Sequence, residues 1–144
     1  MSPRVLRLLE FCDWIRHKLL CRRRPPDHAL GRRGEDLAHR HLQRKGYCIV
    51  ARNFRARSGA GEIDIIARRG DALVFVEVKT RSSTEFGAPD EAVDAHKQRR
   101  IVRAAGEYIR RTEGSWDQAR FDIVSVVFGG SPAIEHLEDA FRPE

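Results

Sequence analysis

The stretch GEIDIIARRGDALVFVEVKTR, Gly61 to Arg81, decides the fold because it reads as two β-strands joined by a tight turn. Both halves are rich in β-branched residues, and the Gly70-Asp71 step between them is typical of a two-residue hairpin loop. A half-buried hairpin needs one apolar face. This hairpin also carries four ionisable side chains near its open end, Glu62, Asp64, Glu77 and Lys79.

The turn fixes which residues of the two strands lie opposite each other. Counting outward from the turn puts Asp64 opposite Glu77 and Glu62 opposite Lys79. Opposed residues share a face of the sheet, with Cβ atoms about 4.5–5.5 Å apart. The sequence therefore predicts two carboxylates side by side, with a lysine one pleat away.

Alternation along each strand predicts one apolar face and one charged face. In the first strand Ile63 and Ile65 should share a face, and Glu62 and Asp64 should share the other. In the second strand the face away from the charges carries Val74, Val76 and Val78.

Two carboxylates directly opposite each other repel unless something lies between them, and a divalent cation is the obvious candidate. Magnesium takes one or two carboxylates and fills its other positions with water and phosphate oxygens. Lys79 would orient a water or stabilise charge that develops on a phosphate. Asp64, Glu77 and Lys79 thus have the parts for hydrolysis of a phosphodiester, with Mg²⁺ or Mn²⁺ as cofactor.

The alternative without a functional site is an exposed sheet face with cross-strand Glu/Lys pairs. Glu62 with Lys79 suits this alternative, whereas Asp64 opposite Glu77 does not, and the apolar runs around them indicate depth. Without metal, the two carboxylates should share a proton more readily than free carboxyls do. Replacing Glu77 by Gln should then cost no stability in the metal-free protein.

The rest of the chain predicts an α/β domain with the order α-β-β-β-α-β-(β). A helix is expected over 29–46, where a basic last turn is followed by glycine, and a strand over 47–54. A second helix follows the hairpin over 90–111. A strand at 120–128 is nearly all apolar on both faces and is therefore expected to be central in the sheet or covered on both faces. A weaker strand is expected over 133–141.

The N-terminal part differs from the domain at 28–144. Residues 4–20 have apolar side chains at helical spacing, and three arginines and two prolines then break the pattern. We therefore expect residues 1–27 to form a basic, amphipathic helical extension and linker. This extension could dock on the domain, contact phosphates through Arg22–Arg24 or lie on a membrane surface, and docking is the preferred interpretation.

The overall charge favours a polyanionic partner. The chain has 27 Lys+Arg against 21 Asp+Glu, a net charge of +6, which points to nucleic acid first and to an anionic membrane second. Three cysteines without CxxC spacing suggest neither a zinc site nor a disulfide framework. With no apolar run near the roughly 18 residues of a membrane span, the sequence predicts a cytoplasmic protein.

Several motifs together resemble a known family. Asp64 followed by Glu77-Val78-Lys79 on the next strand resembles the PD-(D/E)xK nuclease signature. The wider set resembles the YraN-like family of small bacterial proteins over residues 30–128, through GRRGEDLAHRHLQRKGY, ARNFRARSGAGEIDIIARRGDALVFVEVKTR, FGAPDEAV, Lys97 with Arg99-Arg100, and RFDIV. That family is similar to archaeal Holliday-junction resolvases, and the resemblance implies a restriction-endonuclease-like mixed sheet flanked by helices.

The resemblance also implies roles for particular residues. Asp64 and Glu77 would be the metal ligands, Lys79 the catalytic lysine, and Glu35 an acidic residue that the first helix adds to the site. From the residues alone, the preferred interpretation of Glu35 is a side chain on the helix surface paired with Arg32 or His39. A polar and basic segment of the second helix would contact nucleic acid, through Lys97, Gln98, Arg99 and Arg100.

These observations lead to one functional hypothesis and one alternative. The first is a metal-dependent endonuclease that hydrolyses DNA, with branched DNA as a candidate substrate and a homodimer implied by analogy with resolvases. The alternative is a non-catalytic nucleic-acid-binding protein that retains the nuclease fold. The opposed carboxylates favour the first, because a protein that only binds nucleic acid does not need them.

Overall fold

The computed structural model of the protein describes residues 28–82 and 91–144, and the predicted N-terminal extension lies outside them. The described part has an α/β fold, and the predicted order of helices and strands is confirmed. The elements are α2 (His28–Arg44), β1 (Cys48–Arg55), β2 (Glu62–Arg69), β3 (Ala72–Ser82), α3 (Glu91–Arg111), the short 3-10 helix η1 (Trp116–Gln118), β4 (Ala119–Phe128) and β5 (Ala133–Phe141).

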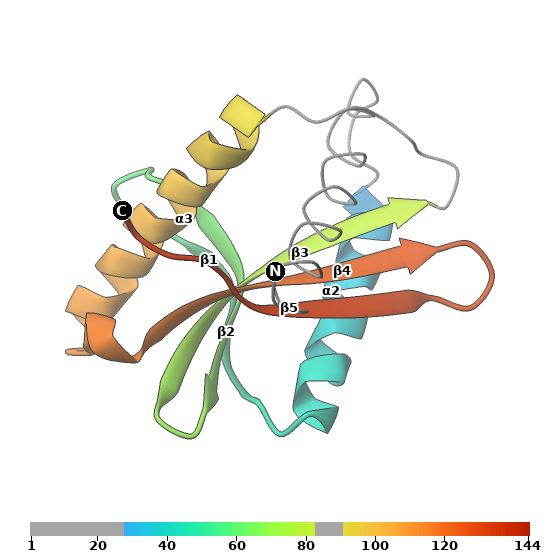
Figure 1. Ribbon diagram of the computed structural model, residues 1–144, viewed down its shortest axis with the longest axis horizontal. Coiled ribbons are helices and arrows are strands. Elements are labelled where there is room, and N and C mark those ends of the chain that lie inside the picture. The colour runs from blue at the N-terminus through green and yellow to red at the C-terminus, as the bar shows by residue number, and fades with distance from the viewer. Residues whose placement is uncertain (1–27, 83–90) are drawn as a thin grey trace, which may run out of the picture.

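The strands form one mixed sheet in the order β1-β2-β3-β4-β5. β3 and β4 pair in parallel, and the other neighbours are antiparallel. Because parallel neighbours need a crossover connection, α3 lies between these two strands in the sequence. Figure 1 shows α2 and α3 on opposite sides of the sheet. No helix among the described residues is long and apolar enough to cross a membrane.

Two apolar cores lie on the two faces of the sheet, and burial of their side chains is the main favourable term in folding. The α3 core consists of Ala56, Ile63, Ile66, Leu73, Phe75, Ile101, Ala104, Ala105, Ile109 and Phe121. The α2 core consists of Ala38, Leu42, Tyr47, Ile65, Ala67, Val74, Val76, Val124 and Val126. β4 contributes to both cores, which confirms that this apolar strand is covered twice.

The hairpin of β2 and β3 has the predicted register over most of its length. The paired residues run from Arg69 and Ala72 at the turn to Ile65 and Val76. Gly70 has a φ of 57°, which glycine adopts without strain at the first position of such a turn. The turn that the sequence predicts is therefore correct, and the ladder ends just before the charged residues begin.

At Asp64 the side chains of β2 stop alternating regularly. Ile63 packs in the α3 core and Ile65 in the α2 core, so the prediction that they share a face is wrong. The neighbouring strand is irregular at the same level, because Asn53 of β1, which lies level with Asp64, has a φ of 50°. A left-handed residue inside a strand bends it, and β2 separates from β3 at this bend.

Two glycines let the helices approach the open end of the hairpin. A Cβ atom on Gly34 of α2 would come within 3.0 Å of Thr80 Cβ on β3, and closer still to its Oγ1. A Cβ atom on Gly61, just before β2, would come within 3.1 Å of the Arg100 backbone oxygen on α3. The two helices are therefore packed tightly against the part of the hairpin that carries the charged residues.

Replacing Gly34 by Ala should destabilise the protein, although alanine is the better helix former by about 1 kcal/mol. The added methyl group would overlap Thr80, and overpacking of this kind typically costs about 1–3 kcal/mol. Gly31 of the same helix has no atom within 4 Å of its Cβ position, so Gly31→Ala should stabilise by about 0.5–1 kcal/mol. Urea unfolding measures the change in the free energy of unfolding that each substitution causes. Stabilisation by both substitutions would contradict the close approach at Gly34.

Candidate active site

Asp64 lies where β2 and β3 separate. Its Oδ2 accepts a hydrogen bond from the Val78 backbone N–H at 2.8 Å. In a continued antiparallel ladder that N–H would bond to the backbone of β2, so the carboxylate replaces a hydrogen bond that the separation removes. The side chain of Asp64 is thereby held against β3, next to Glu77.

Glu77 is buried, with 5% relative exposure, and two lysines lie against one of its oxygens. Lys97 Nζ is 2.5 Å from Glu77 Oε1, and Lys79 Nζ is 3.3 Å from the same atom. Lys79 follows Glu77 on β3, whereas Lys97 comes from α3. Such partners are needed because an unpaired charge in the protein interior is costly.

Burial raises the pKa of Asp64 well above its usual 3.8, and the charge of Glu77 raises it further. The Val78 N–H and the Lys97 ammonium act in the opposite direction without cancelling these effects, and Glu35 adds to the upward shift. Of the two carboxyl groups, Asp64 is therefore the one whose ionisation the site disfavours.

The pKa of Glu77 is shifted in the opposite direction from that of Asp64. Burial disfavours its charge, but Lys79 and Lys97 outweigh burial and lower the pKa of Glu77 below its usual 4.5. Burial also disfavours the charge of Lys97, yet contact with Glu77 raises the pKa of Lys97. The two pKa values are thus shifted in opposite directions, upward for Asp64 and downward for Glu77, in line with the proton sharing expected from the hairpin.

Glu35 of α2 lies near this pair, since its charge contributes to the raised pKa of Asp64. Its Oε2 is 3.5 Å from Arg52 Nη2, and the same arginine lies 2.8 Å from Asp36. The structure therefore gives Glu35 a partner on β1. Glu35 stands beside the site at electrostatic range, with its carboxylate held by Arg52.

Glu62 does not lie opposite Lys79 as the extended register predicts. It is exposed and forms an ion pair with Arg55 of β1, with 2.9 Å between Oε1 and Nε. The ladder between β2 and β3 stops before reaching it. Lys79 is therefore drawn to Glu77 of its own strand instead.

The segment of α3 predicted to contact nucleic acid divides into two parts. Lys97 points into the site, a role that the sequence does not reveal because it depends on how α3 packs on the sheet. Gln98 is partly buried, and Arg99 and Arg100 are exposed. Arg100 Nε donates to the Ala60 backbone oxygen at 3.2 Å, which ties α3 to the loop before β2.

The carboxylate pair suits a divalent cation that shares its coordination with other groups. Among residues 28–82 and 91–144, no cluster of three or more His, Cys, Asp and Glu side chains could hold a metal ion. Asp64 and Glu77 nevertheless provide two hard oxygen donors in one place, and Mg²⁺ needs no more when water and phosphate complete its shell. Lys79 and Lys97 offset part of the negative charge at this site, which a bound cation would otherwise offset.

A second buried charged cluster lies on the α2 face of the sheet, since Asp122 is the β4 partner of Val76. Arg120 Nε and Nη2 donate to the Asp122 carboxylate at 2.8 and 2.7 Å, and the Asp139 backbone N–H donates at 3.0 Å. His136 Nε2 lies 2.7 Å from the same carboxylate. Asp122 is therefore satisfied within its own cluster, on the face opposite Glu77.

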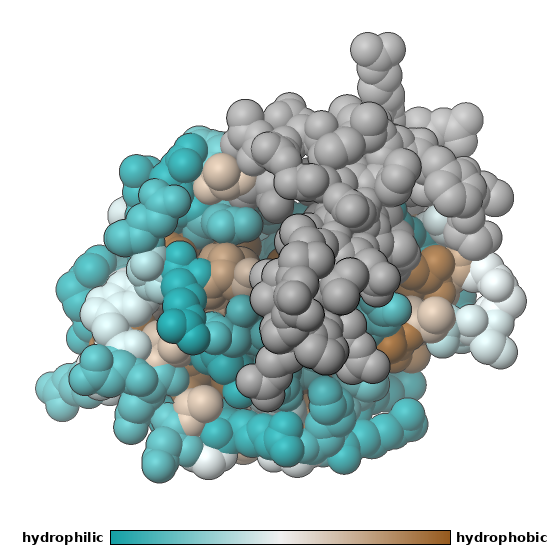
Figure 2. All heavy atoms as spheres, viewed as in Figure 1, coloured by the Kyte–Doolittle hydropathy of each residue, from teal (hydrophilic) through white to brown (hydrophobic). Residues whose placement is uncertain are grey.

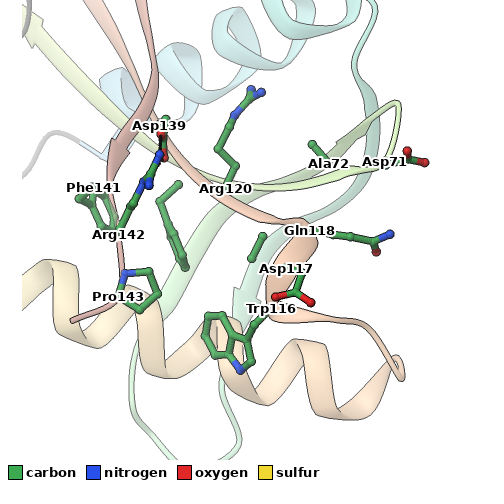
Figure 3. A pocket seen from close by; sticks show the side chains of 12 residues that line it. Asp71, Ala72, Trp116, Asp117, Gln118, Arg120, Asp139, Phe141, Arg142 and Pro143 are labelled. Atoms are coloured by element: carbon green, nitrogen blue, oxygen red, sulfur yellow. Dashed lines mark hydrogen bonds and ion pairs between the residues drawn. The ribbon is translucent and has the colours of Figure 1, made fainter.

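An open groove of about 700 Å³ lies at the other end of the sheet from the carboxylates. Figure 3 shows Trp116, Arg142 and Pro143 around it, with Asp139 beside Arg142. Its lining includes Ala72, the first residue of β3, which is about 16 Å along the strand from Glu77 at roughly 3.3 Å per residue. The groove therefore plays no part in the carboxylate site.

The raised pKa of Asp64 predicts a specific pH dependence of stability. The folded protein retains this proton at pH values where the unfolded chain has lost it, so stability should fall as pH rises from about 4. Asp64→Asn removes the cost of ionising this buried side chain, and its melting temperature should exceed that of the parent by a margin that grows as pH rises above about 4 and levels off above the raised pKa of Asp64. Asp71→Asn, in the exposed turn of the same hairpin, should track the parent. A margin that shrinks with pH would contradict the assignment.

Glu77→Gln should destabilise the metal-free protein, which reverses the expectation from the hairpin alone. The substitution removes the carboxylate charge that both Lys79 and Lys97 contact, and breaking a buried pair in this way costs about 3 kcal/mol or more. Glu62→Gln removes an exposed pair of the same hairpin and should cost no more than about 1 kcal/mol. Urea unfolding with chelator present compares the two variants, and equal costs would mean that the lysines do not depend on Glu77.

The comparisons with known proteins identify the family. The sequence model of the uncharacterised protein family UPF0102 matches residues 34–126, which include the whole carboxylate site. A UPF0102 protein of Solibacter usitatus is 54% identical over 124 residues, covering 86% of this chain and 92% of the relative. UPF0102 proteins of Rhodococcus opacus and Geobacter metallireducens are 50% and 48% identical over 115 residues, covering 78% and 79% of this chain and 96% and 93% of the relatives. The chain therefore belongs to the UPF0102 family, the YraN-like group of small bacterial proteins.

Proposed function

We propose that this protein is a metal-dependent endonuclease that hydrolyses phosphodiester bonds of DNA. The observation that carries the proposal is the burial of Glu77 beside Asp64 with Lys79 on the same carboxylate. A protein that needed only a stable sheet would gain nothing from two acidic residues that cannot both ionise. The resemblance to PD-(D/E)xK nucleases, which have a restriction-endonuclease-like fold, agrees with this reading.

In this proposal Asp64 and Glu77 hold a divalent cation, Mg²⁺ or Mn²⁺. When bound, such a cation polarises phosphoryl oxygens and lowers the pKa of coordinated water. Asp64 releases its proton as it becomes a ligand, and Glu77 contributes an oxygen that is already charged. Lys79 keeps its ammonium beside the pair, where it stabilises negative charge that develops on the phosphate. Glu35, at electrostatic range, increases the attraction of the site for cations.

The nucleic-acid partner is proposed from charge. The chain carries a net charge of +6, and Arg99 and Arg100 of α3 are exposed near the site. Hydrophilic residues cover most of the described surface visible in Figure 2. Phosphate contacts of this kind give affinity without reading the base sequence, so the shape of the DNA would decide the substrate. Branched DNA is the first candidate, and two symmetric cuts in it would require a homodimer.

A cleavage panel tests the proposed function. Single-stranded, duplex, flap and four-way DNA are incubated with the protein and Mg²⁺ or Mn²⁺, and at least one substrate should be cut. Lys79→Met should reduce the cleavage rate by about 100-fold or more, the scale seen when a donor to developing charge is lost, while metal still binds. Arg68→Met, which removes an exposed charge from β2 outside the site, should leave the rate unchanged.

Two outcomes would contradict the proposal. Undiminished cutting by Lys79→Met would remove the proposed mechanism. Salt-sensitive binding of DNA without cutting of any substrate by either metal would favour the alternative, a nucleic-acid-binding protein that keeps the nuclease-like site without its activity.

A further inference from the structure

Two ammonium groups converge on one oxygen atom of the carboxylate site. Lys97 Nζ lies 2.5 Å from Glu77 Oε1, and Lys79 Nζ lies 3.3 Å from it. A carboxylate oxygen offers two lone pairs in its plane, so Oε1 has little capacity for a further cationic partner. The position that a metal ion would take on this oxygen is therefore contested by a group of the protein itself.

The two lysines differ in how readily their ammonium groups can move away from Glu77. Lys79 is on a strand between two other strands, and its side chain has 12% relative exposure. Lys97 is on α3, and its side chain has 33% relative exposure, so its four-carbon stem can carry the ammonium into water. Lys97 also makes the shorter contact. It is therefore the partner that both blocks Oε1 and can withdraw from it.

We propose that Lys97 is an internal counter-cation that occupies the metal position on Glu77 until a divalent cation displaces it. This inference rests on the proposed metal dependence of the site. Binding of a divalent cation by this carboxylate would separate Lys97 from Glu77, because the cation would repel an ammonium on the same oxygen. The released ammonium remains beside the site, where it can contact a phosphate of the substrate. Lys97 thus makes metal affinity lower than the two carboxylates alone would give.

Metal titration of three variants tests this role without measuring activity. Each chelator-treated protein is titrated with MnCl₂ while its melting temperature is followed, since a ligand of the folded state raises it. Lys97→Met keeps the length of the stem and removes the competing charge, and should bind Mn²⁺ about tenfold more tightly than the parent, within the usual range of coupling between two ligands. Arg103→Met, on the exposed side of the same helix, removes one positive charge away from Glu77 and should change affinity less than twofold.

Lys97→Gln serves as a second variant in case the methionine variant does not fold. It can still donate a hydrogen bond to Glu77 but carries no charge, so it should also bind Mn²⁺ more tightly than the parent. Parent-like or weaker affinity in both Lys97 variants would overturn the inference, since Lys97 would then be indifferent to the metal or would support it. A gain of equal size in Arg103→Met would also overturn it, because general charge would explain the effect.

The same data separate this inference from the proposed function. If the parent binds Mn²⁺ and cuts DNA while the Lys97 variants bind no more tightly, only the counter-cation role fails. If the Lys97 variants bind more tightly and the parent cuts no DNA, the counter-cation role stands and the nuclease proposal fails. If neither the parent nor any variant responds to Mn²⁺, both fail together.

Discussion

The hydrogen bond from the Val78 backbone to Asp64 is the contact on which the geometry of the site depends. Where two antiparallel strands separate, their backbone groups lose the hydrogen bonds between the strands. Buried backbone groups need other hydrogen-bond partners in their place. A carboxylate placed at the fork meets this need while remaining available for chemistry. Because Asp64 accepts this bond, β2 can bend away from β3 without leaving the Val78 N–H unpaired, and the Asp64 carboxyl is held beside Glu77.

The charges of the protein are arranged differently on the two faces of the sheet. On the α2 face, Asp122 is surrounded by an arginine, a histidine and a backbone donor, all within one closed cluster. On the other face, Glu77 contacts two lysines, and burial and the charge of Glu77 raise the pKa of its neighbour Asp64. The Asp122 cluster pairs its own charges completely. The cluster at Glu77 shifts the pKa values of two neighbouring carboxyl groups in opposite directions, and perturbed pKa values of this kind gather at functional sites.

The sequence predicted the fold well where the governing interactions are local. The turn at Gly70 and the pairing up to Ile65 and Val76 follow from alternation and turn chemistry, and both are confirmed. The extension of that register past Asp64 failed, because the bend in β2 depends on an irregular residue in the neighbouring strand β1. Strand alternation carries no information about such a bend.

In the candidate site too, the sequence predicts what local interactions determine and misses what tertiary packing determines. Asp64, Glu77 and Lys79 lie together on one hairpin, as the sequence predicts, although regular pairing ends at Ile65 and Val76. The contact of Lys97 with Glu77 instead depends on the docking of a helix that begins nine residues after β3 ends. No spacing rule for a hairpin can include a side chain delivered by tertiary packing. For the same reason the effect of the two lysines on Glu77 reverses a stability expectation that was reasonable for two carboxylates alone.

The parallel pairing of β3 with β4 links the carboxylate site to the crossover that contains α3. The β2-β3 hairpin closes a short loop and can form within microseconds, but β3 and β4 can pair only after the long crossover that contains α3 has closed. The crossover that this parallel pairing requires is the element that carries Lys97, so the same helix that joins β3 to β4 also delivers the ammonium that contacts Glu77.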